Sequence, residues 1–274
     1  MKTAVVGHIE WMEFAEVERV PRAGDIVHAR ASFTEPAGGG AVAAVQLVRL
    51  AGNCTLYTAI GNDEVGQRSK ARLEELGVRV EAAVRRDEPS RHGFTYLDDD
   101  HERTITVIGA RLHPRRSDLL PWHELEEVDA VYFCAGDAGA LQAARTARAL
   151  VATARVLDTL REGAVELDAL VGSTKDPNEA YVPGTLQPPP RLVVGTAGAE
   201  GGTWTGAEGR TGHWAAAPLP GPRADSYGAG DSFAAGLAYA LGGGRGVKDA
   251  LDLAARCGAT SMTGRGPYTR QLGM

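Results

Sequence analysis

Short apolar segments, glycine turns and helical segments alternate along the first third of this 274-residue chain. Thr3–Gly7 has the composition of a buried strand, and Gly38–Gly40 lead into a small-residue helix over Ala41–Leu50. Cys54–Ile60 predicts a second strand, and the spacing of apolar residues predicts an amphipathic helix over Glu64–Leu76. Because strand, turn, helix and strand succeed one another, we predict an α/β fold with a mostly parallel central sheet and helices on both faces.

A β-rich region interrupts this alternation between about residues 78 and 112. Val78–Val80, Phe94–Leu97 and Arg103–Ile108 have strand composition, and no helical segment separates them. Residues 10–33 are irregular as well. We therefore predict one domain over residues 1–274, in which segments 10–33 and 78–112 form a small β lid beside the main sheet.

The α/β pattern resumes after residue 129. Ala130–Phe133 and Leu192–Val194 predict strands, and a further strand is expected within Val165–Val171. Helices are predicted over Ala138–Thr153 and Val247–Thr263. The spacing of these segments continues the central sheet.

Composition limits the partners and the compartment. The formal net charge is -6 and there is no basic run, so we expect no nucleic-acid or membrane partner. The three cysteines are widely spaced and include no CxxC pair, which favours a reducing cytoplasm over a disulfide framework or a zinc site. No segment has the length and apolarity of a signal peptide or a membrane span, so a soluble cytoplasmic protein is expected.

Residues 225–233, with the sequence DSYGAGDSF, carry the strongest chemical signal. Gly228, Ala229 and Gly230 precede an apolar helix, where backbone N–H groups lack partners and the helix dipole favours an anion. Asp231 places a carboxylate at the same point. A base beside an anion-binding turn suits phosphoryl transfer to a hydroxyl. The alternative is an ordinary helix start with an acidic residue in its first turn.

This stretch resembles the C-terminal signature of the ribokinase-like (PfkB) carbohydrate kinases, and residues 36–52 resemble their N-terminal signature. The resemblance extends from Val5 to about Tyr268. It implies a three-layer ribokinase-like fold and ATP-dependent phosphorylation of a hydroxyl on a small carbohydrate-like substrate. In that reaction Asp231 accepts the hydroxyl proton and the N–H groups of residues 228–230 stabilise the phosphoryl group. Gly38 and Gly39 would approach the substrate closely.

The resemblance also implies the nucleotide and metal ligands. Asp176 and Glu179 match the family's Asn-x-x-Glu element and would hold hydrated Mg²⁺ in the outer sphere, although Asn178 offers another registration and a helix cap is the structural alternative. The implied nucleotide-binding residues are Thr196, Gly198 and Gly201.

Asp225 corresponds to a residue that helps to bind a monovalent cation such as K⁺ in relatives. Here the Tyr227 carbonyl and the Gly266 loop would complete that site. Capping of a turn by Asp225 is an equal alternative.

Two departures alter the expected acceptor pocket. Sugar kinases of this type carry Asp and Asn where this chain has Met12 and Ala43. Glu10 takes over as the candidate substrate ligand. Trp11 and Phe14 offer stacking surfaces, which keeps a nucleoside kinase of the same fold as an alternative, beside a catalytically silent sugar-binding or regulatory homologue.

The lid raises two further expectations. One of its arginines, Arg91, Arg103 or Arg111, would bind an anionic acceptor, whereas a solvated lid surface is the alternative. Exposed strand edges favour a homodimer formed through the lid.

Overall fold

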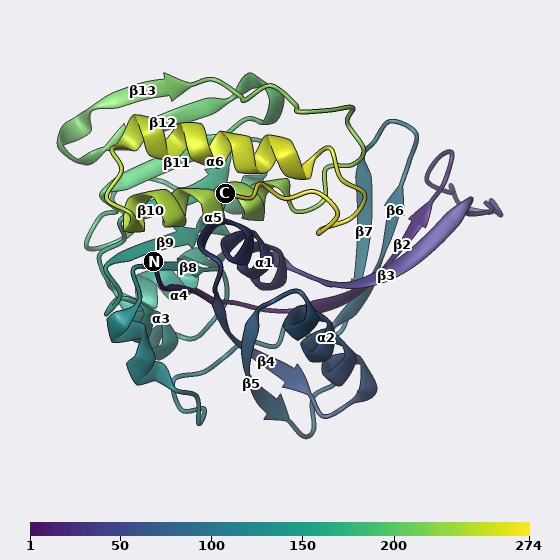
Figure 1. Ribbon diagram of the computed structural model, residues 1–274, viewed down its shortest axis with the longest axis horizontal. Coiled ribbons are helices and arrows are strands. Elements are labelled where there is room, and N and C mark those ends of the chain that lie inside the picture. Colours follow the sequence, from purple (N-terminus) through teal and green to yellow (C-terminus); the bar gives the residue numbers. More distant parts are fainter.

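A nine-stranded sheet runs through the computed structural model, which describes all residues 1–274 (Figure 1). The strand order is β13-β12-β11-β10-β9-β8-β1-β4-β5. Pairing is parallel from β5 to β11, and β12 and β13 add an antiparallel edge. The strands are β1 (Thr3–Val6), β4 (Thr55–Gly61), β5 (Arg79–Arg85), β8 (Ala130–Phe133), β9 (Ala149–Thr153), β10 (Ala169–Ser173), β11 (Leu192–Thr196), β12 (Gly202–Gly206) and β13 (Thr211–Trp214).

Helices cover both faces of this sheet and enclose two apolar clusters. One cluster joins the sheet to α1, α2, α5 and α6, and the other joins it to α3, α4 and the short helix η1. The helices are α1 (Gly39–Ala51), α2 (Glu64–Glu75), α3 (Ala138–Ala144), α4 (Leu157–Gly163), α5 (Ala229–Gly242), α6 (Val247–Ser261) and η1 (Trp122–Glu127). The predicted three-layer α/β architecture with a mostly parallel sheet is therefore confirmed.

A second, four-stranded sheet projects from one side of the main body and forms the lid (Figure 1). Its order is β3-β2-β6-β7, with a parallel β2–β6 pair between two antiparallel pairs. The strands are β2 (Glu10–Glu16), β3 (Ala31–Ala37), β6 (His92–Leu97) and β7 (Arg103–Ile108). Segment 78–112 is divided between the two sheets, because β5 pairs with β4 in the main sheet.

The helix predicted over Ala138–Thr153 is wrong in its second half. Helix α3 ends at Ala144, and Ala149–Thr153 forms strand β9, every residue of which is buried between β8 and β10. Periodicity does not separate a short, fully buried strand from a buried helix, so tertiary pairing decides the outcome.

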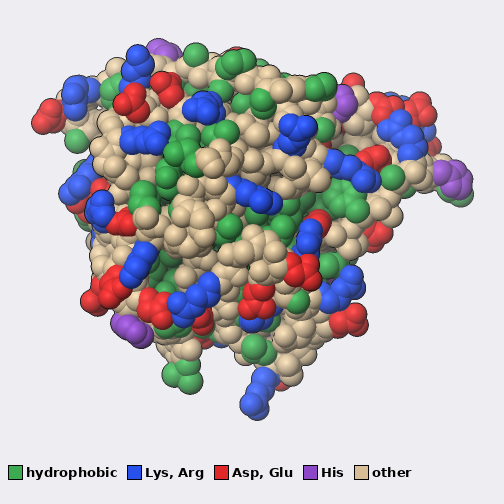
Figure 2. Space-filling view, viewed as in Figure 1, with side chains coloured by type: hydrophobic (Ala, Val, Ile, Leu, Met, Phe, Trp, Pro, Cys, Tyr) green, Lys and Arg blue, Asp and Glu red, His purple; other side chains and the backbone are tan.

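Charges of both signs are interspersed over the face shown in Figure 2. No helix combines the length and the apolarity that a membrane crossing requires.

Candidate active site

Parallel strands end at the same edge of a sheet, and here that edge gathers the predicted site residues. His8 and Glu10 follow β1, Arg155 follows β9, and the loop after β10 carries Asp176 and Glu179. Helices α1 and α5 begin at this edge, and they pack against each other. The two glycine-rich turns, 190 residues apart in the sequence, therefore belong to one site.

The N-terminus of α5 is open to a ligand. Gly228 has a left-handed backbone with φ of 75°, and no group in the protein accepts a hydrogen bond from the N–H of Gly228, Ala229 or Gly230. A Cβ atom at Gly230 would meet nothing within 4 Å. The three N–H groups and the positive end of the helix dipole thus form an anion-binding turn.

The buried Asp225 side chain holds this turn in place through hydrogen bonds to two backbone N–H groups. It is 1% exposed, its Oδ1 accepts from the Tyr227 N–H at 2.7 Å, and its Oδ2 accepts from the Gly266 N–H at 2.6 Å. Burial raises the pKa of the Asp225 carboxyl, against the effect of these two hydrogen bonds. The structure therefore shows Asp225 as a cap that joins two loops.

Asp231 lies in the first turn of α5 and points toward the start of α1. A Cβ atom at Gly39 would lie 2.7 Å from Asp231 Oδ1, so only glycine leaves room for this carboxylate. Tyr132 Oη donates to the same oxygen at 3.3 Å. Burial raises the pKa of the Asp231 carboxyl, while the hydrogen bond from Tyr132 and the charges of His8, Arg155 and Arg103 oppose the rise. A carboxylate with a raised pKa is better suited to accept a proton.

Glu10 begins a polar cluster on the lid side of Asp231. The Glu10 side chain is 9% exposed, and its Oε1 lies 3.4 Å from His8 Nε2 and 3.3 Å from Arg91 Nε. Burial raises the pKa of the Glu10 carboxyl, but the hydrogen bond with His8 and the nearby positive charges outweigh burial, so the pKa is lowered. A Cβ atom at Gly38 would lie 3.2 Å from Glu10 Cγ. Glu10 therefore packs against the glycine turn at the start of α1, and Gly39 of the same turn lies beside Asp231.

The positions of the two sequence departures are apolar. Met12 and Ala43 are both fully buried. Alternation along β2 puts Met12 on the same face as Glu10 and Phe14, and Trp11 on the opposite face, where the Arg68 guanidinium lies 4.5 Å from its ring centroid. Phe14 is fully buried against Phe33 and Tyr227. The two aromatic rings predicted to stack on a base thus do not share a surface.

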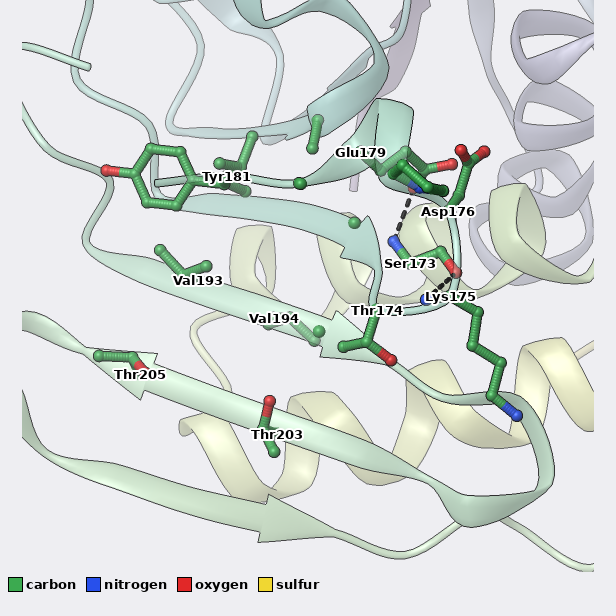
Figure 3. Close-up of a pocket in the computed structure, with 16 residues that line it drawn as sticks. Ser173, Thr174, Lys175, Asp176, Glu179, Tyr181, Val193, Val194, Thr203 and Thr205 are labelled. Carbon is green, nitrogen blue, oxygen red and sulfur yellow. Dashed lines mark hydrogen bonds between the residues drawn. The ribbon is translucent and has the colours of Figure 1, made fainter. Parts of the chain in front are cut away.

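Asp176 and Glu179 lie together at the end of β10, and Arg155 bridges them. One Arg155 nitrogen, Nη2, is 3.0 Å from Asp176 Oδ2 and 2.5 Å from Glu179 Oε1. Glu179 Oε2 accepts from the Ser173 N–H at 2.7 Å, the contact drawn in Figure 3. The hydrogen bond from the Asn178 N–H lowers the pKa of Asp176. Because two carboxylate oxygens converge on a single positive group, their arrangement fits a hydrated divalent cation.

A cavity of about 340 Å³ lies beside this acidic pair, under the ends of β10, β11 and β12 (Figure 3). Its lining includes Lys175, Tyr181 and Thr203 but neither Asp231 nor Glu10. The cavity therefore does not include the predicted acceptor ligand or the predicted general base. No group of three or more His, Cys, Asp or Glu side chains with metal-binding geometry occurs in the structure.

Of the predicted nucleotide residues, Thr196 ends β11, and Gly198 and Gly201 follow it at the same edge. A Cβ atom at Gly198 would have open space, whereas one at Gly201 would lie 2.1 Å from the Trp214 carbonyl oxygen. Close packing against the backbone of Trp214 therefore requires glycine at position 201. Thr196 is hydrogen-bonded through its carbonyl to Thr174, and its hydroxyl donates to the Gly172 carbonyl at 3.4 Å.

The three lid arginines differ in their surroundings. Arg91 faces Glu10, while Arg103 donates to the Ser226 carbonyl at 3.0 Å and so ties β7 to the turn before α5. Arg111 is exposed, and its side chain makes no ion pair within the protein. Sequence reasoning missed His8, Tyr132 and Arg155. Of these, only His8 could have been found from the sequence, because it lies two residues before the candidate ligand Glu10.

Comparison with known proteins identifies relatives over the whole chain. The family model described as "pfkB family carbohydrate kinase" matches residues 2–159 and 139–272. A ribokinase of Dictyostelium discoideum is 29% identical over 106 residues, a segment that covers 38% of this chain and only 33% of that protein.

Three solved structures share the fold. Ribokinase of Thermotoga maritima has a TM-score of 0.74 at 20% identity, covering 97% of this chain and 94% of its own. Arabidopsis thaliana ribokinase, solved with ribose and ATP, has a TM-score of 0.73 at 19% identity, with 96% and 93% covered. The nucleoside kinase of Methanocaldococcus jannaschii has a TM-score of 0.74 at 17% identity, with 100% and 95% covered.

Proposed function

Since this chain belongs to the pfkB family of carbohydrate kinases, we propose that it transfers a phosphoryl group from ATP to a hydroxyl of a small carbohydrate-like acceptor. The observation that carries the proposal is the position of Asp231. Its carboxylate adjoins both the unpaired N–H groups of α5 and the glycine turn of α1. A base and an anion-binding turn therefore meet at one point.

Asp231 acts as the general base. The acceptor hydroxyl donates its proton to an Asp231 oxygen as the hydroxyl oxygen attacks the γ-phosphorus, and the bond to the leaving ADP oxygen breaks. Tyr132 Oη, 3.3 Å from Oδ1, orients the carboxylate. The raised pKa of Asp231 improves its match to this proton transfer.

The N–H groups of Gly228, Ala229 and Gly230 stabilise the negative charge on the moving phosphoryl group. Thr196 and Gly198 would contact the nucleotide, a role supported for Gly198 by the open space around it, and Gly201 would support the loop. Asp176 and Glu179 would hold hydrated Mg²⁺ in the outer sphere, and that ion would supply charge neutralisation of the nucleotide phosphates.

Glu10, Gly38 and Gly39 bind the acceptor. The Glu10 carboxylate, kept ionised by its lowered pKa, accepts hydrogen bonds from acceptor hydroxyls. The close backbone approach at the two glycines fixes the position of the reacting hydroxyl near Asp231. The lid, whose strand β2 begins at Glu10, would exclude water from the transfer.

A monovalent cation such as K⁺ would bind beside Asp225 through the Tyr227 carbonyl. Both Asp225 oxygens already accept N–H groups, so the cation's contribution is to balance the buried charge of this carboxylate. Turnover in K⁺ compared with tetramethylammonium at equal ionic strength tests this role.

We also propose that the 274 residues act as one kinase domain that forms a homodimer through the lid. Strand β7 is an unpaired sheet edge, is exposed at every residue, and presents Ile105, Val107 and Ile108 to solvent. Apolar edge strands pair readily with a second copy. This arrangement is tested by the solution mass of the protein.

The activity is tested by ADP release over a panel of sugars, sugar phosphates, sugar acids and nucleosides, with ATP and Mg²⁺. We expect at least one acceptor to raise ADP release well above the acceptor-free rate. Loss of that increase in Asp231→Asn, with nucleotide binding intact, assigns it to this site. No turnover across the panel in a protein that still binds ADP would contradict the proposal.

A further inference from the structure

Arg155 occupies the place where the two acidic side chains converge. The same nitrogen, Nη2, contacts one oxygen of Asp176 and one of Glu179, at 3.0 and 2.5 Å. The other oxygen of each carboxylate is held by the backbone, since Asp176 Oδ1 accepts from the Asn178 N–H at 2.9 Å and Glu179 Oε2 from the Ser173 N–H. The two oxygens that remain for a cation are the ones that Arg155 takes.

The Arg155 guanidinium lies at the surface, where it can exchange with another cation. The Arg155 side chain is 51% exposed, and Asp176 and Glu179 are its only ion-pair partners. Its backbone is fixed separately, because its N–H donates to Thr153 Oγ1 at 3.3 Å. Because the guanidinium is half exposed, water can solvate it when it leaves, and an incoming cation would replace the charge that it removes from Asp176 and Glu179, which are 26% and 9% exposed.

We propose that Arg155 is a latch that competes with a divalent cation for the Asp176–Glu179 pair. When the metal–nucleotide complex binds, the guanidinium is displaced from both carboxylates. Arg155 thus weakens metal binding and keeps the acidic pair neutralised until nucleotide arrives. The inference rests on the proposed function for the identity of the nucleotide, but the competition itself requires no turnover.

A second arginine provides a matched control. Arg191 also bridges two acids, with Nη2 2.6 Å from Glu166 Oε2 and Nη1 3.2 Å from Asp168 Oδ1, and its side chain is 59% exposed. It precedes β11 and so lies at the opposite edge of the sheet. Arg191→Met removes the same charge and the same number of ion pairs at a distance from the proposed cation site.

The test is a titration with Mn²⁺ in the presence of ADP, followed by electron paramagnetic resonance of free Mn²⁺. Arg155→Met should lower the Mn²⁺ dissociation constant about three- to tenfold, since the two ion pairs of Arg155 no longer compete with the metal. Arg155→Lys should give a smaller decrease. Arg191→Met should leave the constant unchanged, and Glu179→Gln added to Arg155→Met should remove most of the gain.

Unchanged or weaker Mn²⁺ binding in folded Arg155→Met would overturn the latch. Equal tightening in Arg191→Met would also overturn it, because the effect would then be one of net charge alone. The outcome is independent of catalysis. A latch confirmed in a protein without turnover would contradict the kinase proposal alone, and turnover with no metal effect would contradict the latch alone.

Discussion

Asp231 and Glu10 are carboxylates at two ends of one site, and their surroundings shift the pKa in opposite directions. Burial raises the pKa of Asp231 at the phosphoryl end, whereas His8, Arg91 and Arg111 outweigh burial and lower the pKa of Glu10 at the acceptor end. The first environment prepares a group to take a proton, and the second keeps a group charged. The difference suits Asp231 to proton transfer and Glu10 to recognition of the acceptor.

The largest expected effect comes from Asp231→Asn at the phosphoryl end. Loss of the general base should lower kcat by about 10²–10⁴-fold while ADP binding is retained, as measured by steady-state kinetics and calorimetry. Asp249→Asn, an exposed acid in the first turn of α6, is the control and should keep wild-type turnover.

The same substitution should raise thermal stability at neutral pH. A raised folded pKa means that Asp231 favours folding when protonated, an advantage that is lost as pH rises from the usual value of 3.8 through the folded pKa. Asn removes the cost of burying the charge. A melting temperature of Asp231→Asn that exceeds wild type at pH 7, and converges with it toward pH 3.8, checks the sign.

Two glycine variants separate backbone geometry from ligand access at the phosphoryl end. Gly228→Ala should cost about 1–3 kcal/mol of unfolding free energy, because its φ is left-handed and the new Cβ would lie 2.8 Å from Val42. In Gly230→Ala the new Cβ has room within the protein, so the free energy of unfolding should not change. The methyl group would crowd the phosphoryl group bound at the turn, so kcat should fall about tenfold. Equal stability losses in denaturant titrations of both variants would count against this distinction.

At the acceptor end, Glu10→Gln should raise the acceptor KM about tenfold and leave the ATP KM unchanged, because a charged hydrogen-bond acceptor is lost.

The lowered folded pKa of Glu10 gives stability that is present above the usual value of 4.5 and is lost as pH falls through the folded pKa. Glu10→Gln should therefore be less stable than wild type at pH 7, and the difference should disappear as the pH falls below the folded pKa of Glu10. Glu13→Gln, exposed on the other face of β2, is the control.

The smallest effect on turnover is expected far from both ends, at the lid edge. Ile108→Lys places a charge on exposed β7, 51% exposed at this residue, and should convert a dimer into monomers with turnover within about twofold of wild type. Light scattering after size-exclusion chromatography measures this change. If the wild-type protein is monomeric at micromolar concentration, the result contradicts the proposed homodimer.

The two ends also differ in how far the sequence reveals them. The turn before α5 was predictable because a left-handed glycine, unpaired N–H groups and an acid in the first turn are all local features. Met12 and Ala43 predict an altered acceptor pocket from residue type alone, and the structure shows both side chains to be buried. Those expectations needed no knowledge of strand order.

Tyr132 and Arg155 could not be predicted in the same way. Tyr132 reaches Asp231 across 99 residues of sequence, and Arg155 meets Asp176 only because β9 and β10 are neighbours in the sheet. Strand β9 itself was mistaken for helix because all five of its residues are buried. Side chains that meet through sheet order leave no periodic signal.

We assign proton transfer to Asp231 and acceptor binding to Glu10. The most direct test of this assignment measures kcat and acceptor KM for Asp231→Asn and Glu10→Gln in parallel, with the acceptor that the panel identifies. We predict a fall in kcat of about 10²-fold or more for Asp231→Asn. For Glu10→Gln we predict a higher acceptor KM with kcat changed by no more than about threefold. A kcat near the wild-type value in Asp231→Asn would contradict the role of Asp231 as general base.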